Sequence, residues 1–231
     1  MTEQVVPDET KPRQSKRDFF EQLALSHLPE MRLLFRGGKL YKKDQWRNIV
    51  EHSLVQVAVA DELSDLIGLS PEEKDDLIKV AACHDWRKRL ERYPDDFTKK
   101  DETQVRTFLK RVGPKQNLMY ATGPDFLKRF LKGESSFLER LQCYIDDIVL
   151  DSDVIGYDRR LEETRKRYPE LDDDFFEKER GLDNQVAQEI FMRLPFSVQG
   201  QIGEPKHIPN FIRLRIEKRW LDNKQEELSL G

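Results

Sequence analysis

The segment SPEEKDDLIKVAACHD, residues 70–85, carries the clearest structural signal in this chain. Ser70 is a favourable helix N-cap, Pro71 suits the first helical position, and Glu73 completes a capping box with Ser70. Apolar residues then follow at positions that a helix can bury, namely Leu77, Ile78, Val80, Ala81 and Ala82. The segment therefore predicts a helix that carries His84 and Asp85 near its C-terminal end.

A second amphipathic helix is predicted just before it, over residues 45–67. Its apolar positions follow the spacing of one helix face and are Ile49, Val50, Leu54, Val57, Ala58 and Ile67. Asp44 can cap its start, and Gly68 can end it in a left-handed conformation. His52 lies within this helix, at the border of its apolar face.

The rest of the chain also has helical patterns. Further helices are expected over residues 102–112, 124–133, 158–168, 174–194 and 209–223, and one that begins at Ser136. Asp101 with Gln104 can form a capping box for the first of these, and Gly181 can split the segment 174–194 in two. No alternating pattern is long enough to predict a strand. The predicted fold class is all-α.

The length of the chain indicates one domain, or one domain with appendages. With 231 residues, we expect a flexible N-terminal arm over 1–17, a helical core over 18–168, and C-terminal helices over 169–231 that pack on the core. The start lacks the apolar stretch of a secretory signal, and no apolar run is long enough to span a bilayer. The net charge of −4 argues against binding to extended nucleic acid.

Cys83 and Cys143 are the only cysteines, and they have no metal-binding spacing between them. Their apolar surroundings favour reduced core thiols in a cytoplasmic protein. Cys83 adjoins His84, so a thiolate nucleophile is the alternative interpretation.

Two of the four histidines suggest a metal site. His52, His84-Asp85 and Asp153 offer a mixed nitrogen and oxygen ligand set, which suits Mn²⁺, Fe²⁺, Ni²⁺, Co²⁺ or Zn²⁺ better than Mg²⁺. If the helix from Ser136 continues past residue 150, Asp153 shares a face with apolar residues and points toward the core. Four ligands on an octahedral ion leave one position for water and one for a substrate oxygen.

Three segments resemble the HD-domain superfamily of metal-dependent phosphohydrolases: RNIVEHSL (47–54), VAACHD (80–85) and DSDVI (151–155). The resemblance covers roughly residues 32–168 and implies an HD-like helical bundle. It implies a single metal ion held by His52, His84, Asp85 and Asp153, because the remaining histidines, His27 and His207, lie far from these motifs.

Other aspartates compete for the last ligand position. Asp146, Asp147 and Asp151 lie close to Asp153 in the sequence. Asp153 is preferred because a small residue precedes it and an aliphatic residue follows two places on, as in the superfamily.

The same resemblance assigns two further site residues. Lys88 matches the lysine of the HD-x-x-K variant, and Arg36, in Arg36-Gly37-Gly38, resembles an arginine that touches phosphate in nucleotidase-type members. We expect Asp85 and Lys88 to act in catalysis and Lys88 and Arg36 to bind substrate. A solvated lysine and a loop arginine are the alternatives. Nucleotidase-type members have an acid in place of Lys88, which disfavours a mechanism that uses a protein acid there.

The expected function is hydrolysis of a small phosphoester, with nucleotides among the candidate substrates. The alternative is a metal-containing HD-domain protein that binds a ligand or regulates without catalysis, and a helical partner-binding protein without metal is a third interpretation. No membrane partner is expected. The apolar residues Phe175-Phe176 and those in 211–216 either pack in the core or form a homodimer contact.

Overall fold

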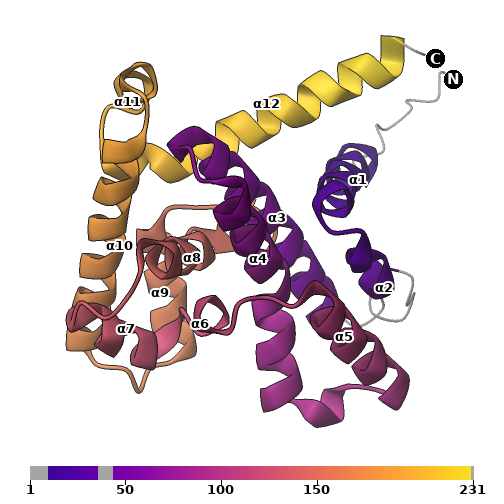
Figure 1. Cartoon of the computed structure of the whole chain (residues 1–231), viewed down its shortest axis with the longest axis horizontal. Coiled ribbons are helices and arrows are strands. Elements are labelled where there is room, and N and C mark those ends of the chain that lie inside the picture. The colour runs from indigo at the N-terminus through magenta and orange to yellow at the C-terminus, as the bar shows by residue number, and fades with distance from the viewer. Residues whose placement is uncertain (1–9, 36–43, 230–231) are drawn as a thin grey trace, which may run out of the picture.

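The computed structural model describes residues 10–35 and 44–229, and these residues form a helical assembly (Figure 1). The helices are α1 (Thr10–His27), α2 (Arg32–Phe35), α3 (Asp44–Ile67), α4 (Pro71–Arg92), α5 (Lys99–Val112), α6 (Gln116–Met119), α7 (Gly123–Leu131), α8 (Phe137–Asp147), α9 (Tyr157–Arg167), α10 (Asp173–Arg193), α11 (Phe196–Ile202) and α12 (Ile208–Ser229). Short 3-10 turns lie at Pro29–Met31, Pro94–Asp96 and Pro205–His207. Strands β1 (Val149–Leu150) and β2 (Asp153–Val154) form a small antiparallel hairpin. The predicted all-α class is confirmed.

Helices α3 and α4 form the central helical hairpin. Gly68 lies between them at φ 67°, a left-handed conformation that a glycine adopts without strain, and ends α3 as predicted. The predicted capping box opens α4: Glu73 N donates to Ser70 Oγ over 3.3 Å, and Ser70 N donates to the Glu73 carboxylate over 3.0 Å. Because the connection is short, the two helices run antiparallel and pack along their lengths.

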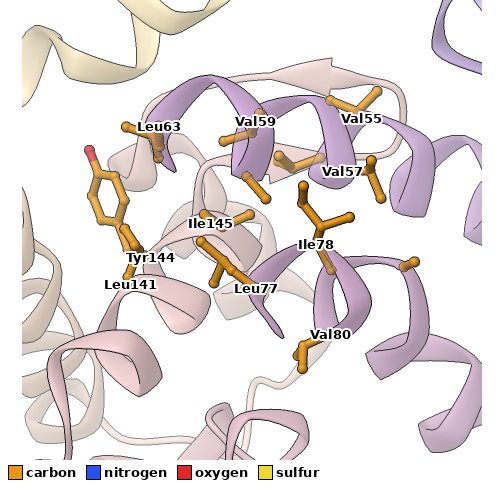
Figure 2. Close-up of a cluster of buried hydrophobic side chains, with 14 of the residues drawn as sticks. Val55, Val57, Val59, Leu63, Leu77, Ile78, Val80, Leu141, Tyr144 and Ile145 are labelled. Atoms are coloured by element: carbon orange, nitrogen blue, oxygen red, sulfur yellow. The ribbon is translucent and has the colours of Figure 1, made fainter. Parts of the chain in front are cut away.

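The core lies where α8 packs against both helices of this hairpin. Figure 2 shows the contributing side chains, which are Val55, Val57, Val59 and Leu63 from α3, Leu77, Ile78 and Val80 from α4, and Leu141, Tyr144 and Ile145 from α8. Residues 52–64 of α3 are buried on every side. A helix enclosed in this way must satisfy its polar side chains internally, so the buried His52 and Gln56 need partners within the protein.

The remaining helices surround this centre. Helix α10 packs on α8, and α12 packs on α3 and extends beyond the other helices (Figure 1). Within the expected N-terminal arm the chain is helical from Thr10, and α1 packs along α3. None of the helices in the described ranges is both long enough and apolar enough to cross a membrane.

Three local predictions differ from the structure. Helix α5 is capped by Thr98 with Asp101 and begins at Lys99, and Gly181 lies within an unbroken α10. The helix from Ser136 does not continue past residue 150, because α8 ends at Asp147 and the chain turns into the β1–β2 hairpin. Asp151 in that turn has φ 52°, a left-handed conformation that an α-helix cannot contain.

Asp61 of α3 ties α1, α4 and α12 together. Asp61 is only 3% exposed. Its carboxylate accepts hydrogen bonds from His27 over 3.1 Å, Lys74 over 2.7 Å and Arg219 over 2.9 Å. Burial alone would raise the pKa of Asp61, but the hydrogen bonds from His27, Lys74 and Arg219 outweigh it and hold the pKa well below its usual range.

Asp61→Asn should therefore lower the free energy of unfolding by about 1–3 kcal/mol at pH 7. A carboxyl group whose pKa is lower in the folded than in the unfolded state stabilises the folded protein at pH values above the unfolded-state pKa of about 3.9. This stabilisation is lost as the pH falls below that value. Urea unfolding at pH 7 and pH 3 should show the difference from wild type shrinking at low pH. Asp65→Asn is the control, because Asp65 also pairs with Lys74 but its side chain is 65% exposed. Equal losses in both variants at pH 7 would contradict this account.

Candidate metal centre

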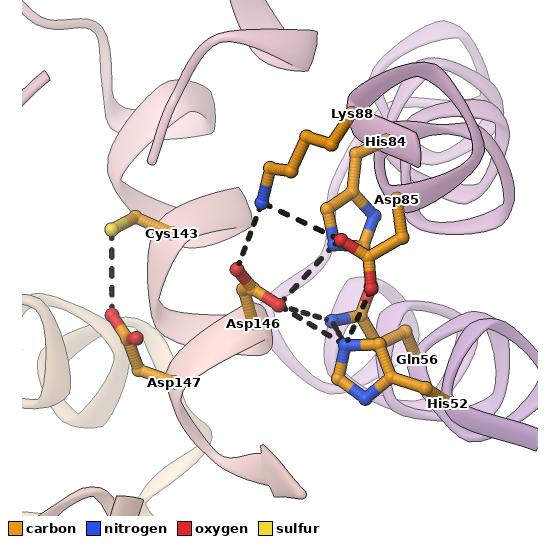
Figure 3. Close-up of polar contacts among 8 residues, drawn as sticks. All are labelled: His52, Gln56, His84, Asp85, Lys88, Cys143, Asp146 and Asp147. Carbon is orange, nitrogen blue, oxygen red and sulfur yellow. Dashed lines mark hydrogen bonds and ion pairs between the residues drawn. The ribbon is translucent and has the colours of Figure 1, made fainter. Parts of the chain in front are cut away.

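Three helices bring their polar side chains together at one point (Figure 3). His52 comes from α3, His84 and Asp85 come from α4, and Asp146 comes from α8. His52 Nε2 lies 3.1 Å from Asp146 Oδ1 and 3.4 Å from Asp85 Oδ2. His84 Nε2 lies 3.2 Å from Asp146 Oδ1 and 3.3 Å from Asp85 Oδ1. Both imidazoles therefore direct Nε2 toward the same two carboxylates.

Helical spacing accounts for two further members of the cluster. Lys88 lies one turn beyond His84 on α4, and its ammonium nitrogen is 3.5 Å from Asp85 Oδ1 and 3.5 Å from Asp146 Oδ2. Gln56 lies one turn beyond His52 on α3, and its amide nitrogen donates to Asp146 Oδ1 over 2.8 Å and lies 2.8 Å from His52 Nε2. Gln56 was not among the residues predicted from the sequence. Its signal in the sequence is a polar residue one turn from His52 within the otherwise apolar stretch 54–60.

The cluster is buried on the histidine side and open on the lysine side. The His84 side chain is fully buried and that of Asp146 is 10% exposed, whereas Lys88 is 30% exposed and Asp85 is 25% exposed. A molecule from solvent would therefore approach past Asp85 and Lys88.

Opposite charges shift the pKa values of the cluster. Burial would raise the pKa of Asp146, but Lys88 and His84 hold it well below its usual value. Burial would likewise raise the pKa of Asp85, but His84, Lys88 and His52 lower it. The pKa of Lys88 is raised by Asp146 and Asp85 against the effect of burial, and the same two carboxylates raise the pKa of His84. Both carboxylates are therefore ionised at neutral pH.

The contacts of the two imidazoles fit a bound cation. Each Nε2 carries at most one proton, yet each faces oxygens of both carboxylates, which can only accept. The Gln56 amide also points a donor at His52 Nε2, which requires a lone pair there. Lone pairs from two imidazoles and two carboxylates could all be satisfied by one divalent metal ion, and this donor set is typical of first-row transition metals. His52, His84 and Asp85 offer ligand atoms within 4.8 Å of one another.

The structure brings together most, but not all, of the residues predicted for the site. His52, His84, Asp85 and Lys88 meet as expected. Asp153 does not join them, since it lies on β2 with its side chain exposed, and Asp146 reaches the histidines instead. The reason is the end of α8 at Asp147, which removes the helical face that was expected to direct Asp153 inward. Arg36 lies outside the described residues.

The other competing aspartates also lie elsewhere. Asp151 is exposed in the turn between β1 and β2. Asp147 follows Asp146 directly but points to the opposite side of α8, where Cys143 Sγ lies 3.4 Å from its Oδ2 (Figure 3). Asp146 is therefore the α8 carboxylate that faces the histidines.

No protein-family model matches this chain, and neither the curated proteins nor the solved structures include one with significant similarity to it.

Proposed function

We propose that this protein is a metal-dependent phosphohydrolase that holds one divalent metal ion with His52, His84, Asp85 and Asp146. The observation that carries the proposal is the convergence of two imidazole nitrogens and two ionised carboxylates on one point, beside a lysine that is partly open to solvent. The resemblance of the His52 and His84-Asp85 segments to the HD-domain superfamily supports the same reaction class.

A divalent ion held by these residues would supply Lewis acidity for a hydrolytic water molecule and for a phosphoryl oxygen. The side chains would do the rest. Asp85 is the more exposed of the two carboxylates and is ionised, so one of its oxygens can accept a proton from the hydrolytic water. The buried Asp146 receives a hydrogen bond from Gln56, which fixes its orientation toward the histidines.

The charge of the site favours an anionic substrate. Two carboxylates, the Lys88 ammonium and a divalent ion leave one net positive charge with neutral histidines. Lys88 lies on the open side of the cluster, where it can donate to a phosphate oxygen. A small phosphomonoester or phosphodiester fits this charge, and a nucleotide belongs to the same chemical class.

The direct test combines metal analysis with a substrate screen. Purified protein loaded with Mn²⁺, Fe²⁺, Ni²⁺, Co²⁺ or Zn²⁺ should hydrolyse at least one member of a panel of aryl phosphates, phosphodiesters and nucleotides. Asp85→Ala should abolish that turnover. Unchanged turnover in Asp85→Ala would refute the proposed mechanism, and bound metal without turnover on any substrate would favour the non-catalytic alternative.

Lys88→Met should raise KM for the phosphoester by roughly 10–100-fold, because a charge-assisted hydrogen bond to phosphate contributes about 1.5–3 kcal/mol. Metal affinity should stay equal or increase, since the ammonium no longer repels the ion. Steady-state kinetics and metal titration would measure the two effects separately. Lys79→Met is the matched control on the same helix, because Lys79 pairs only with the exposed Asp75 among the described contacts. An unchanged KM in Lys88→Met would remove Lys88 from substrate binding.

A further inference from the structure

A second cluster of metal-binding side chains lies on the far side of α8 from the histidines. Cys143 and Asp147 are one helical turn apart on α8, and Glu179 and Asp183 are one turn apart on α10. Because α8 packs directly on α10, the two pairs face each other. Cys143, Asp147 and Glu179 offer ligand atoms within 4.8 Å of one another.

Asp183 has no positively charged partner among the described residues. It is 0% exposed, and neither of its carboxylate oxygens receives a hydrogen bond from any described residue. It lies within hydrogen-bonding reach of the Asp147 side chain and is close enough to Glu179 for their charges to interact. Two carboxylates can only accept, so this contact satisfies neither of them unless a proton or a cation lies between them.

The charge of the whole cluster leads to the same requirement. Glu179 is 7% exposed and Asp147 is partly buried, and no described lysine or arginine forms an ion pair with Asp147, Glu179 or Asp183. The charges of Arg160 and Lys88 act on Asp147 from a greater distance and lower its pKa, but burial and the charge of Asp146 outweigh them. Ionised carboxylates without partners are strongly disfavoured in a protein interior. Asp147 is the least buried of the four side chains.

We infer that Cys143, Asp147, Glu179 and Asp183 bind a second divalent metal ion, separate from the one proposed at the histidines. Zinc is the metal that fits best. It accepts thiolate and carboxylate ligands together, and four protein ligands make a closed structural site. Calcium and magnesium do not favour a thiolate, so they fit less well.

Such an ion would fix the position of α8. It would bind two helices through two ligands each, and α8 carries Asp146 directly beside Asp147. The orientation of Asp146 toward His52 and His84 would then depend on both metal centres. This role is one of positioning, because none of the four ligands faces the open side at Lys88.

Cobalt is a suitable probe, since it substitutes for zinc and gives a charge-transfer absorption when a thiolate binds it. We expect the full-length protein, stripped with a chelator and titrated with Co²⁺, to bind two equivalents and to develop this absorption. Cys143→Ser should lose the absorption. Asp183→Asn should bind one equivalent fewer and also lose the absorption.

Two control variants separate this site from the histidine site. Cys83→Ser changes the other cysteine, which is buried in α4, and should keep the absorption. Asp146→Asn should lose one equivalent at the histidine site and keep the absorption, so failure of one site is distinguishable from failure of the other. Absence of thiolate charge transfer in the wild-type protein would overturn the inference, even with one Co²⁺ bound at the histidines. Retention of the absorption in a Cys143→Ser variant that circular dichroism shows to be folded would also overturn the inference.

Discussion

Asp146→Asn should reduce metal-dependent phosphoester hydrolysis by roughly a hundredfold or more, because loss of even an outer-shell partner of a metal ligand costs 10–100-fold in activity or affinity. Asp146 Oδ1 is within 3.2 Å of both histidine Nε2 atoms, so asparagine removes the negative charge at the centre of the cluster while keeping the shape of the side chain. Turnover at saturating substrate and the affinity of the histidine site for Co²⁺ should both fall. Kinetics and metal titration on the same preparation would measure them.

Asp153→Asn is the matched control. It makes the same chemical change seven residues further on, at an exposed position on β2. Turnover and metal affinity should stay at the wild-type level. If instead Asp153→Asn abolished activity and Asp146→Asn did not, the last ligand would be Asp153, and the arrangement of α8 and the hairpin would have to change on metal binding.

The choice between these two aspartates marks the limit of what the sequence could predict. The capping box at Ser70 and the left-handed Gly68 are local signals, and local interactions produce them, so the α3–α4 hairpin and its His52 and His84-Asp85 followed from sequence. The last ligand depended on where α8 ends. The apolar residues after Asp147 continue a helical spacing but also suit a short hairpin, and only tertiary packing decides between the two.

The second cluster was also beyond a motif-based prediction. Its two ligand pairs are separated by more than thirty residues in the sequence, and each pair alone is an ordinary i, i+4 spacing on a helix. Cys143 was interpreted as an inert core thiol because its neighbours are apolar. The two pairs form one cluster only because α10 packs on α8, which places Glu179 and Asp183 opposite Cys143 and Asp147.

Asp146 and Asp147 are consecutive on α8 but lie in two different environments. Asp146 faces Lys88 and two histidines, which lower its pKa, whereas burial and the charge of Asp146 raise the pKa of Asp147 to about 7. A helix turns by about 100° per residue, so neighbouring side chains point to different sides. The raised pKa values of Asp147, Glu179 and Asp183 favour their protonated forms in the metal-free protein, and a bound cation would displace those protons.

Glu179→Gln should stabilise the metal-free protein by several kcal/mol at pH 8 and have little effect near pH 4.5. Burial and the charges of Asp147 and Asp146 raise the pKa of Glu179 from 4.5 to about 8. Between these values the folded state holds a proton that the unfolded state has lost, so wild-type stability falls by about 1.4 kcal/mol per pH unit as the pH rises. Glutamine carries no charge and avoids this loss. Urea unfolding across pH 4.5–8 in the presence of a chelator would measure the effect.

Glu177→Gln is the control for this prediction, because Glu177 lies two residues earlier on α10 and its side chain is 69% exposed. Its stability should follow the wild-type pH dependence. Added Zn²⁺ at pH 8 should stabilise wild type and Glu177→Gln more than Glu179→Gln, since Glu179→Gln keeps the histidine site but lacks one ligand of the second site. Parallel pH profiles for wild type and Glu179→Gln in chelator would mean that Glu179 is ionised in the folded protein. A stabilising effect of Zn²⁺ that is equal in all three proteins would place the ion away from Glu179.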